Sequence, residues 1–76
     1  MEIRPRISIV PGVCGGKPIV AGTRMRVIDI LDMLAGGTCE EEILKDFPYI
    51  ARDDIRACLA YAAEVLDHRT VVKAAA

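Results

Sequence analysis

Cysteine and histidine are the side chains of this sequence with the widest chemical repertoire. Cys14, Cys39 and Cys58 are far apart, no Cys-x-x-Cys pair occurs, and the one histidine is not near them. A zinc site needs closely spaced thiolate or imidazole ligands, and a disulfide framework needs an even number of cysteines. We therefore interpret the three cysteines as free thiols of a protein in a reducing compartment, the cytoplasm.

The sequence offers little for catalysis. His68 is the only histidine and Ser8 the only serine, and neither belongs to a spacing that would join a nucleophile to a base. The acidic run Glu40-Glu41-Glu42 has a structural explanation, because carboxylates stabilise the positive end of a helix dipole. We predict that the protein is not an enzyme and holds no metal or other cofactor.

Arginine is the remaining side chain suited to recognition, and the charge is distributed unevenly. Residues 1–26 contain five basic residues and one acidic residue, a net charge of +4, whereas residues 27–76 contain five basic and ten acidic residues, a net charge of −5. A basic arm can bind phosphates or an acidic protein, or it can neutralise the acidic half of the same chain or of a second copy. Both interpretations stay open. The candidate nucleic-acid contacts are Arg4, Arg6, Arg52 and Arg56.

The elements that position these residues change character at Val27. In residues 1–26, an extended β arm, glycine and proline separate two short β-branched runs, Ile7–Val10 and Pro18–Val20, which predict strands. Two short strands are not stable alone in water. We expect them to form a hairpin or to pair with the arm of a second copy.

Three helices are predicted over residues 27–68, where the apolar residues recur with helical spacing. The first begins at Val27 and ends at the glycine pair 36–37. The second is predicted to start with a capping box of Thr38 and Glu41 and to stop at Pro48. A short turn then leads to the third helix, about residues 53–68. The predicted fold is mostly α, a β arm followed by a homeodomain-like, helix-turn-helix bundle.

The third helix is apolar over more of its circumference than packing on one side requires. One predicted buried face contains Ile55, Leu59, Ala62 and Leu66, and a stripe beside it contains Cys58, Tyr61 and Val65. That stripe contacts either a partner or the first helix, and the sequence does not decide between them. For the tail, residues 69–76, a frayed end and an added strand both stay open.

The small size of the chain favours association. Seventy-six residues make one domain at most, and a chain this short buries only about 60% of its unfolded surface. We expect a homodimer, or permanent association with another protein. No segment reaches the roughly 18 apolar residues that a membrane span needs, and no export signal is recognised.

The glycine-rich segment that precedes the first predicted helix matches a known sequence signature. The segment 16–27, GKPIVAGTRMRV, resembles the signature of the family called domain of unknown function 433. The resemblance continues to about Leu66 through Gly37, Glu41–Leu44, Phe47-Pro48, Asp54-Ile55 and Leu59–Ala62. It assigns structural motif positions to Gly16, Pro18, Gly22, Thr23, Gly37 and Pro48. Family members commonly have serine or threonine where this chain has Ala51, and often proline where it has Arg26.

The resemblance implies a function as well as a fold. Many members of that family are similar to VapB-type antitoxins, which are encoded beside a toxin with a PIN-like ribonuclease fold. By this resemblance the chain binds and silences its toxin, and it binds its own promoter as a dimer. The candidate partner or dimer contacts are Arg24, Arg26, Cys58, Tyr61 and Val65. Arg24 has a second interpretation, in which it pins the arm to Asp29 or Asp32.

The third helix favours a protein partner over DNA. Its exposed side is expected to mix Arg52 and Arg56 with several acids, and it has no Asn, Gln or Ser to read bases. We therefore expect an antitoxin that binds its toxin directly and regulates its promoter weakly. The alternatives are a stand-alone DNA-binding transcriptional regulator and a small dimeric interaction module without DNA binding.

Overall fold

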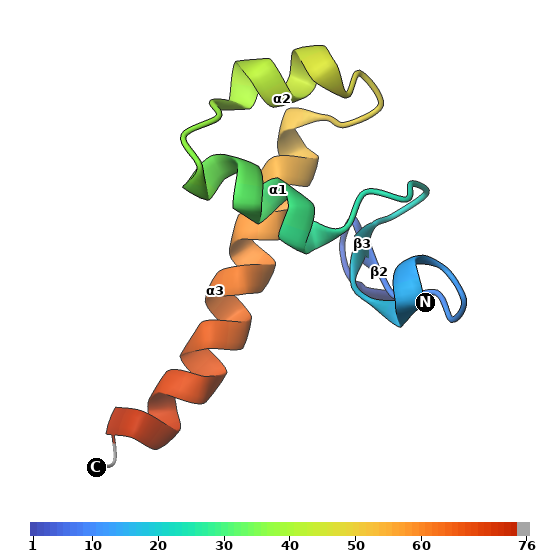
Figure 1. Ribbon diagram of the computed structural model, residues 1–76. Helices are drawn as coiled ribbons and strands as arrows, with labels where there is room; N and C mark the ends of the chain where they lie inside the picture. Colours follow the sequence, from blue (N-terminus) through green and yellow to red (C-terminus); the bar gives the residue numbers. More distant parts are fainter. Residues whose placement is uncertain (75–76) are drawn as a thin grey trace.

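The N-terminal arm forms a three-stranded antiparallel sheet within one chain (Figure 1). The computed structural model describes the backbone of residues 1–74 and the side chains of residues 1–67. The strands are β1 (Glu2–Arg4), β2 (Ile7–Ser8) and β3 (Ile19–Val20), with β2 in the centre. Both predicted strands are present in shortened form, and they pair with each other. Strand β1, which completes the sheet, was not predicted.

A tight turn and a longer loop connect the strands of the sheet. Pro5 and Arg6 connect β1 to β2, and Arg6 has a left-handed backbone with φ of 71°. Its N–H donates to the carboxylate of Glu2 over 3.3 Å. Between β2 and β3 lies the short 3-10 turn η1 (Cys14–Gly16). The arm is therefore a folded unit rather than an extended segment.

Helix α1 (Val27–Ala35) begins and ends as its sequence predicts. Asp29 accepts hydrogen bonds from the backbone N–H and the guanidinium of Arg26, which closes the N-terminus. Gly36 caps the other end, and Gly37 follows with φ of 96°, a conformation that glycine adopts without strain.

Helix α2 (Glu40–Asp46) starts one residue later than predicted. The capping pair is Cys39 and Glu42, whose carboxylate accepts from the Cys39 N–H and Sγ over 3.3 Å each, so the predicted pair of Thr38 and Glu41 is wrong. Either glutamate could reach back, because the run contains three in succession. The helix ends before Phe47 and Pro48, as expected.

Helix α3 (Arg52–Ala74) is longer than the prediction of residues 53–68. Asp54 closes its N-terminus, because its carboxylate accepts from the Ala51 N–H over 2.8 Å. This is one half of a capping box, and the other half is absent because alanine has no side-chain acceptor. The helix continues through residues 69–74, for which the sequence left a frayed end and a strand open, and residues 75–76 lie outside the described part. Within that part, no helix is both long and apolar enough to cross a membrane.

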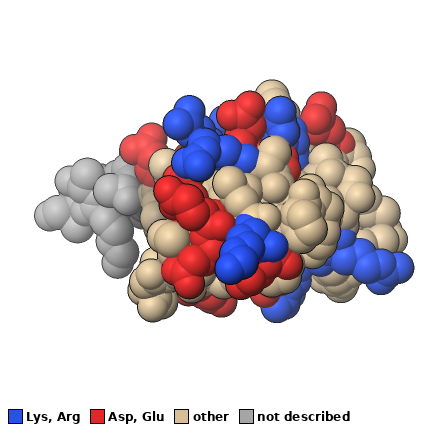
Figure 2. Space-filling model, turned by 90° about the horizontal axis from the view of Figure 1, so that it is seen from above, with Lys and Arg blue, Asp and Glu red and all other residues tan. Residues whose placement is uncertain are grey.

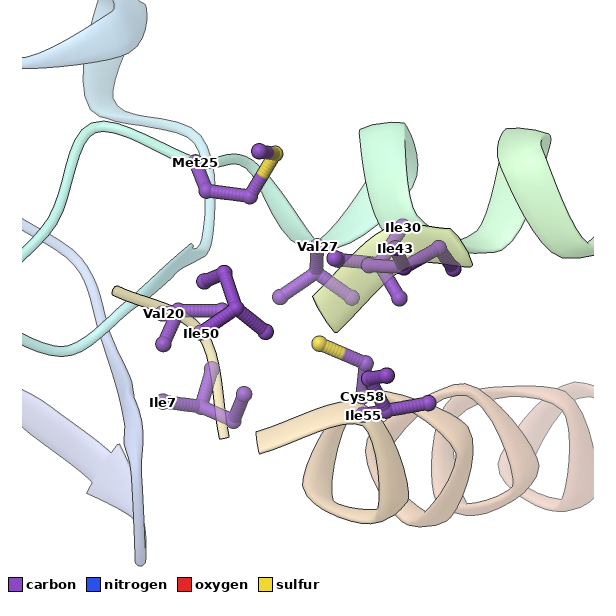
Figure 3. Close-up of a cluster of buried hydrophobic side chains, with 9 residues drawn as sticks. All are labelled: Ile7, Val20, Met25, Val27, Ile30, Ile43, Ile50, Ile55 and Cys58. Carbon is purple, nitrogen blue, oxygen red and sulfur yellow. The ribbon is translucent and has the colours of Figure 1, made fainter. Parts of the chain in front are cut away.

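The core lies where the sheet and the three helices meet (Figure 3). Helix α3 packs against α1, α2 and β2 with its N-terminal half, and its C-terminal half projects away from them (Figure 1). Four isoleucines are completely buried and come from β2 and all three helices: Ile7, Ile30, Ile43 and Ile55. Leu59 and Leu66, predicted to be core, are 44% and 62% exposed, because the buried face of α3 runs through Ile55 and Cys58 instead.

Candidate functional site

An apolar groove of about 400 Å³ lies between α1, α3 and the loop before β3. Helix α3 supplies one wall, and it includes two exposed side chains, Val65 at 37% and Leu66 at 62%. Helix α1 supplies the other wall, where Ile28 is 46% exposed. The complete lining is Lys17, Pro18, Val27, Ile28, Leu31, Tyr61, Ala62, Val65 and Leu66. Such a surface is suited to an apolar side chain or helix of another molecule.

The end of the groove at Lys17 and Pro18 is held in place by backbone hydrogen bonds. The N–H of Val27 donates to the carbonyl of Pro18 over 3.0 Å, and Ile19 forms a β-bridge with Arg26. These contacts join the loop to the first residue of α1. Lys17 is exposed and is the one charged residue of the lining, so the groove is apolar with a single cation at its edge.

The motif residues build the corner that leads into α1. The hydroxyl of Thr23 donates to the Val20 carbonyl over 2.8 Å and accepts from the Met25 N–H over 3.0 Å. Gly22 precedes it with φ of 79°, and Gly16 has φ of 76°, so both positions favour glycine. Pro18 belongs to the groove lining, whereas Gly37 and Pro48 lie in the loops that follow α1 and α2.

One interpretation of Arg24 was an ion pair with Asp29 or Asp32. In the structure Arg26 forms the ion pair with Asp29 instead. Its guanidinium donates to Asp29 over 2.7 and 3.0 Å. The side-chain hydrogen bond from Arg26 lowers the pKa of the Asp29 carboxyl, and the same bond raises the pKa of Arg26. The Arg24 side chain is exposed and forms no ion pair with the residues that the structure describes. Both arginines lie outside the groove lining.

Two basic residues of the arm, Arg4 and Arg6, are paired with acids of α3. Arg4 binds Glu64. Arg6 binds Asp54 at 3.0 Å and approaches Asp53 at 3.6 Å. Arg4 and Arg6 are therefore neutralised by the acidic half of the same chain, which is one of the two interpretations left open, and phosphate binding by either requires the loss of an ion pair.

Arg52 and Arg56 of α3 differ in whether they form an ion pair. Arg52 binds Glu40 at 2.7 Å and so joins α3 to α2. Arg56 is exposed and has no ion pair in the described part of the chain. On the face shown in Figure 2, acidic and basic side chains are interspersed rather than gathered by sign. That face lacks the continuous basic surface typical of nucleic-acid binding.

The family model described as protein of unknown function (DUF433) matches residues 7–62. The chain belongs to the DUF433 family. A DUF433 member protein from Anabaena variabilis has a similar crystal structure, with a TM-score of 0.77 and 28% identity over 83% of this chain and 62% of that one. The resemblance read from residues 16–27 is thus confirmed, and so is the fold of a β arm followed by three helices.

A curated relative shows the same similarity in sequence. It is an uncharacterized protein, y4eO, of Sinorhizobium fredii (strain NBRC 101917 / NGR234), which is 34% identical over 59 residues. The match covers 78% of this chain and 27% of the relative, so the chain spans about a quarter of that protein's length. The DUF433 unit therefore also occurs within a longer polypeptide.

The cysteines of this DUF433 chain are free thiols in three different environments. Cys58 is completely buried in the core of the chain, so its side chain cannot contact a partner from there, and the prediction of Cys58 as a partner contact is wrong. Burial, and then the charge of Asp54, raises the pKa of its thiol to about 11. Cys14 is partly buried, and Cys39 is exposed. Within the described residues, no cluster of three histidine, cysteine or acidic side chains suits a metal ion.

Two of the five predicted contact residues, Tyr61 and Val65, do line the groove. The sequence analysis missed the opposite wall, formed by Ile28 and Leu31 of α1. A signal for it was present, because the apolar arc of α1 is wider than one packing face needs. Ile30 takes the buried side of that arc and Ile28 the groove side.

Proposed function

We propose that this DUF433 chain is a protein-binding module and acts as the antitoxin of a toxin–antitoxin pair. Its partner is a ribonuclease toxin of PIN-like fold, as the family resemblance implies. The observation that carries the proposal is the exposed apolar groove between α1 and α3, with Ile28 and Leu66 on its walls. An apolar surface of this kind gains free energy when a second protein removes it from water.

The charge pattern supports a protein partner ahead of DNA. Three of the four arginines first assigned to nucleic acid, Arg4, Arg6 and Arg52, are engaged by carboxylates of the same chain. Binding a phosphate through them requires the loss of an existing ion pair. Promoter binding is therefore the secondary role in this proposal, and of those four arginines only Arg56 forms no ion pair within the described residues.

Co-expression tests the proposed function. The affinity-tagged chain is produced together with the product of the adjacent gene, and growth and co-purification are measured. We expect the neighbour to inhibit growth alone, the chain to relieve that inhibition, and the two proteins to elute as one complex. A harmless neighbour that does not co-purify contradicts the antitoxin function.

A pair of variants tests the groove itself. Ile28→Lys places a charge on the groove wall, whereas Val10→Lys places the same charge on an exposed aliphatic residue outside the groove. We expect Ile28→Lys to weaken the complex by at least about tenfold, in line with the loss of one buried aliphatic contact, and Val10→Lys to leave it unchanged. Equal affinity of both variants would place the partner elsewhere.

A further inference from the structure

Helix α3 has an exposed apolar stripe beside the groove. Leu59 and Leu66 are 44% and 62% exposed, and Ala63 is exposed between them. Residues with this spacing lie on one face of a helix. The face is distinct from the one that carries Ala62 and Val65 into the groove, and Leu66 lies at the border of the two.

The two ends of this stripe carry opposite charges. Arg56 lies one turn before Leu59, and Asp67 directly follows Leu66. The two charged residues are about three turns apart, so they project from the same side of the helix. Both side chains are exposed, and neither forms an ion pair within the described residues.

We propose that two copies of this chain form a dimer through this stripe, with their α3 helices antiparallel and crossing near Ala63. This crossing point is the midpoint of Arg52–Ala74, so the two helices overlap over their whole length. Leu59 of each copy packs on Leu66 of the other, and Arg56 of each copy pairs with Asp67 of the other.

Charge complementarity selects a second copy in this orientation. An antiparallel pair brings each arginine to an aspartate, whereas a parallel pair would bring like charges together. The stripe is complementary to itself under a two-fold axis, which is the requirement for an isologous dimer. The small side chain of Ala63 also lets the helix backbones approach closely at the crossing.

In the dimer, the C-terminal half of α3 packs against the second copy. That half projects from the sheet and the other helices (Figure 1), and an isolated helical stretch is marginal in water. The N-terminal half of α3 from a second copy covers it. Leu66 is shared with the edge of the groove, but Arg56, Leu59, Ala63 and Asp67 lie outside its lining, so the dimer does not depend on the proposed function.

The test is the oligomeric state of the purified chain, measured by sedimentation equilibrium at micromolar concentration. We expect a dimer. Ala63→Arg places two like charges at the crossing and is expected to produce a monomer, whereas Ala35→Arg adds the same charge at an exposed alanine of α1 and leaves the dimer intact. Circular dichroism checks that both variants keep their helices.

Charge reversal tests the antiparallel register. Arg56→Glu alone and Asp67→Lys alone are each expected to weaken the dimer by roughly tenfold, because each replaces two attractive pairs with two repulsive ones. The double variant restores the pairs and is expected to regain most of the affinity. A monomeric parent chain, a dimer that survives Ala63→Arg, or single reversals without effect would overturn the proposal.

Discussion

Arg6 and Asp54 are 48 positions apart in the sequence, yet Nη1 of Arg6 donates a hydrogen bond to Oδ1 of Asp54 over 3.0 Å. The other carboxylate oxygen, Oδ2, caps α3 at Ala51. One nearly buried aspartate therefore starts the third helix and also fastens the turn between β1 and β2 to it. The sheet and the helices are joined at this point by charge as well as by the apolar core.

Replacement of Asp54 by alanine is expected to destabilise the protein. The variant loses a helix cap and a partner of Arg6, which together cost about 2 kcal/mol in the free energy of unfolding. Urea denaturation followed by circular dichroism measures the change. The matched control is Asp53→Ala, because Asp53 is exposed and its contact with Arg6 is longer, so less than about 1 kcal/mol is expected. Equal losses in both variants would show that the cap contributes little.

The pair of Arg26 and Asp29 predicts a pH dependence of stability. The hydrogen bond from Arg26 lowers the pKa of Asp29 below its ordinary value of 3.8. The stabilisation is therefore fully present above that value and is lost as the pH falls through the lower pKa of the folded state. The melting temperatures of the parent and of Asp29→Asn should differ at neutral pH and converge in strong acid. A difference that stays constant with pH contradicts this origin.

A control on the same helix separates this effect from a general response to acid. Asp32 is exposed and lies one turn after Asp29. The Asp32→Asn variant is expected to follow the melting profile of the parent protein.

The three cysteines are expected to react at different rates with a thiol-reactive disulfide reagent. Exposed Cys39 reacts first and partly buried Cys14 more slowly. Cys58 is protected in the native state, because it is buried and its pKa of about 11 keeps it as the unreactive thiol near neutral pH. Counting the thiols released before and after unfolding measures this. Fast modification of all three in the native protein would contradict the buried position of Cys58.

Binding of the isolated chain to its own upstream DNA is expected to be weak and sensitive to salt. Few unpaired arginines are available, which keeps the affinity low. Because such binding is to phosphates and weakens as salt rises, a gel shift seen at about 50 mM salt should be lost by about 200 mM. Arg56→Ala should weaken the shift further, and Arg24→Ala serves as the control at another exposed arginine without an ion pair in the described part of the chain. A tight, salt-resistant shift would favour the alternative of a DNA-binding regulator.

The sequence by itself determined the family, the three helices and most of their ends. Those features depend on local physics: the glycine pair after Ala35, the proline after Phe47, and apolar residues at helical spacing. The left-handed turns at Gly16 and Gly22 are local in the same way, which is why the motif can be recognised without a fold.

Tertiary structure decided which faces are buried and which charges are free. Leu59 and Cys58 are neighbours with similar apolar character, and only the direction of α1 and β2 puts Cys58 in the core and leaves Leu59 exposed. For Arg6 the sequence left open a phosphate contact and neutralisation by the acidic half of the chain, and the fold brought Asp54 to it. Burial and ion pairing depend on contacts between residues that are far apart in the chain. A single sequence does not show which of these residues lie close together in space.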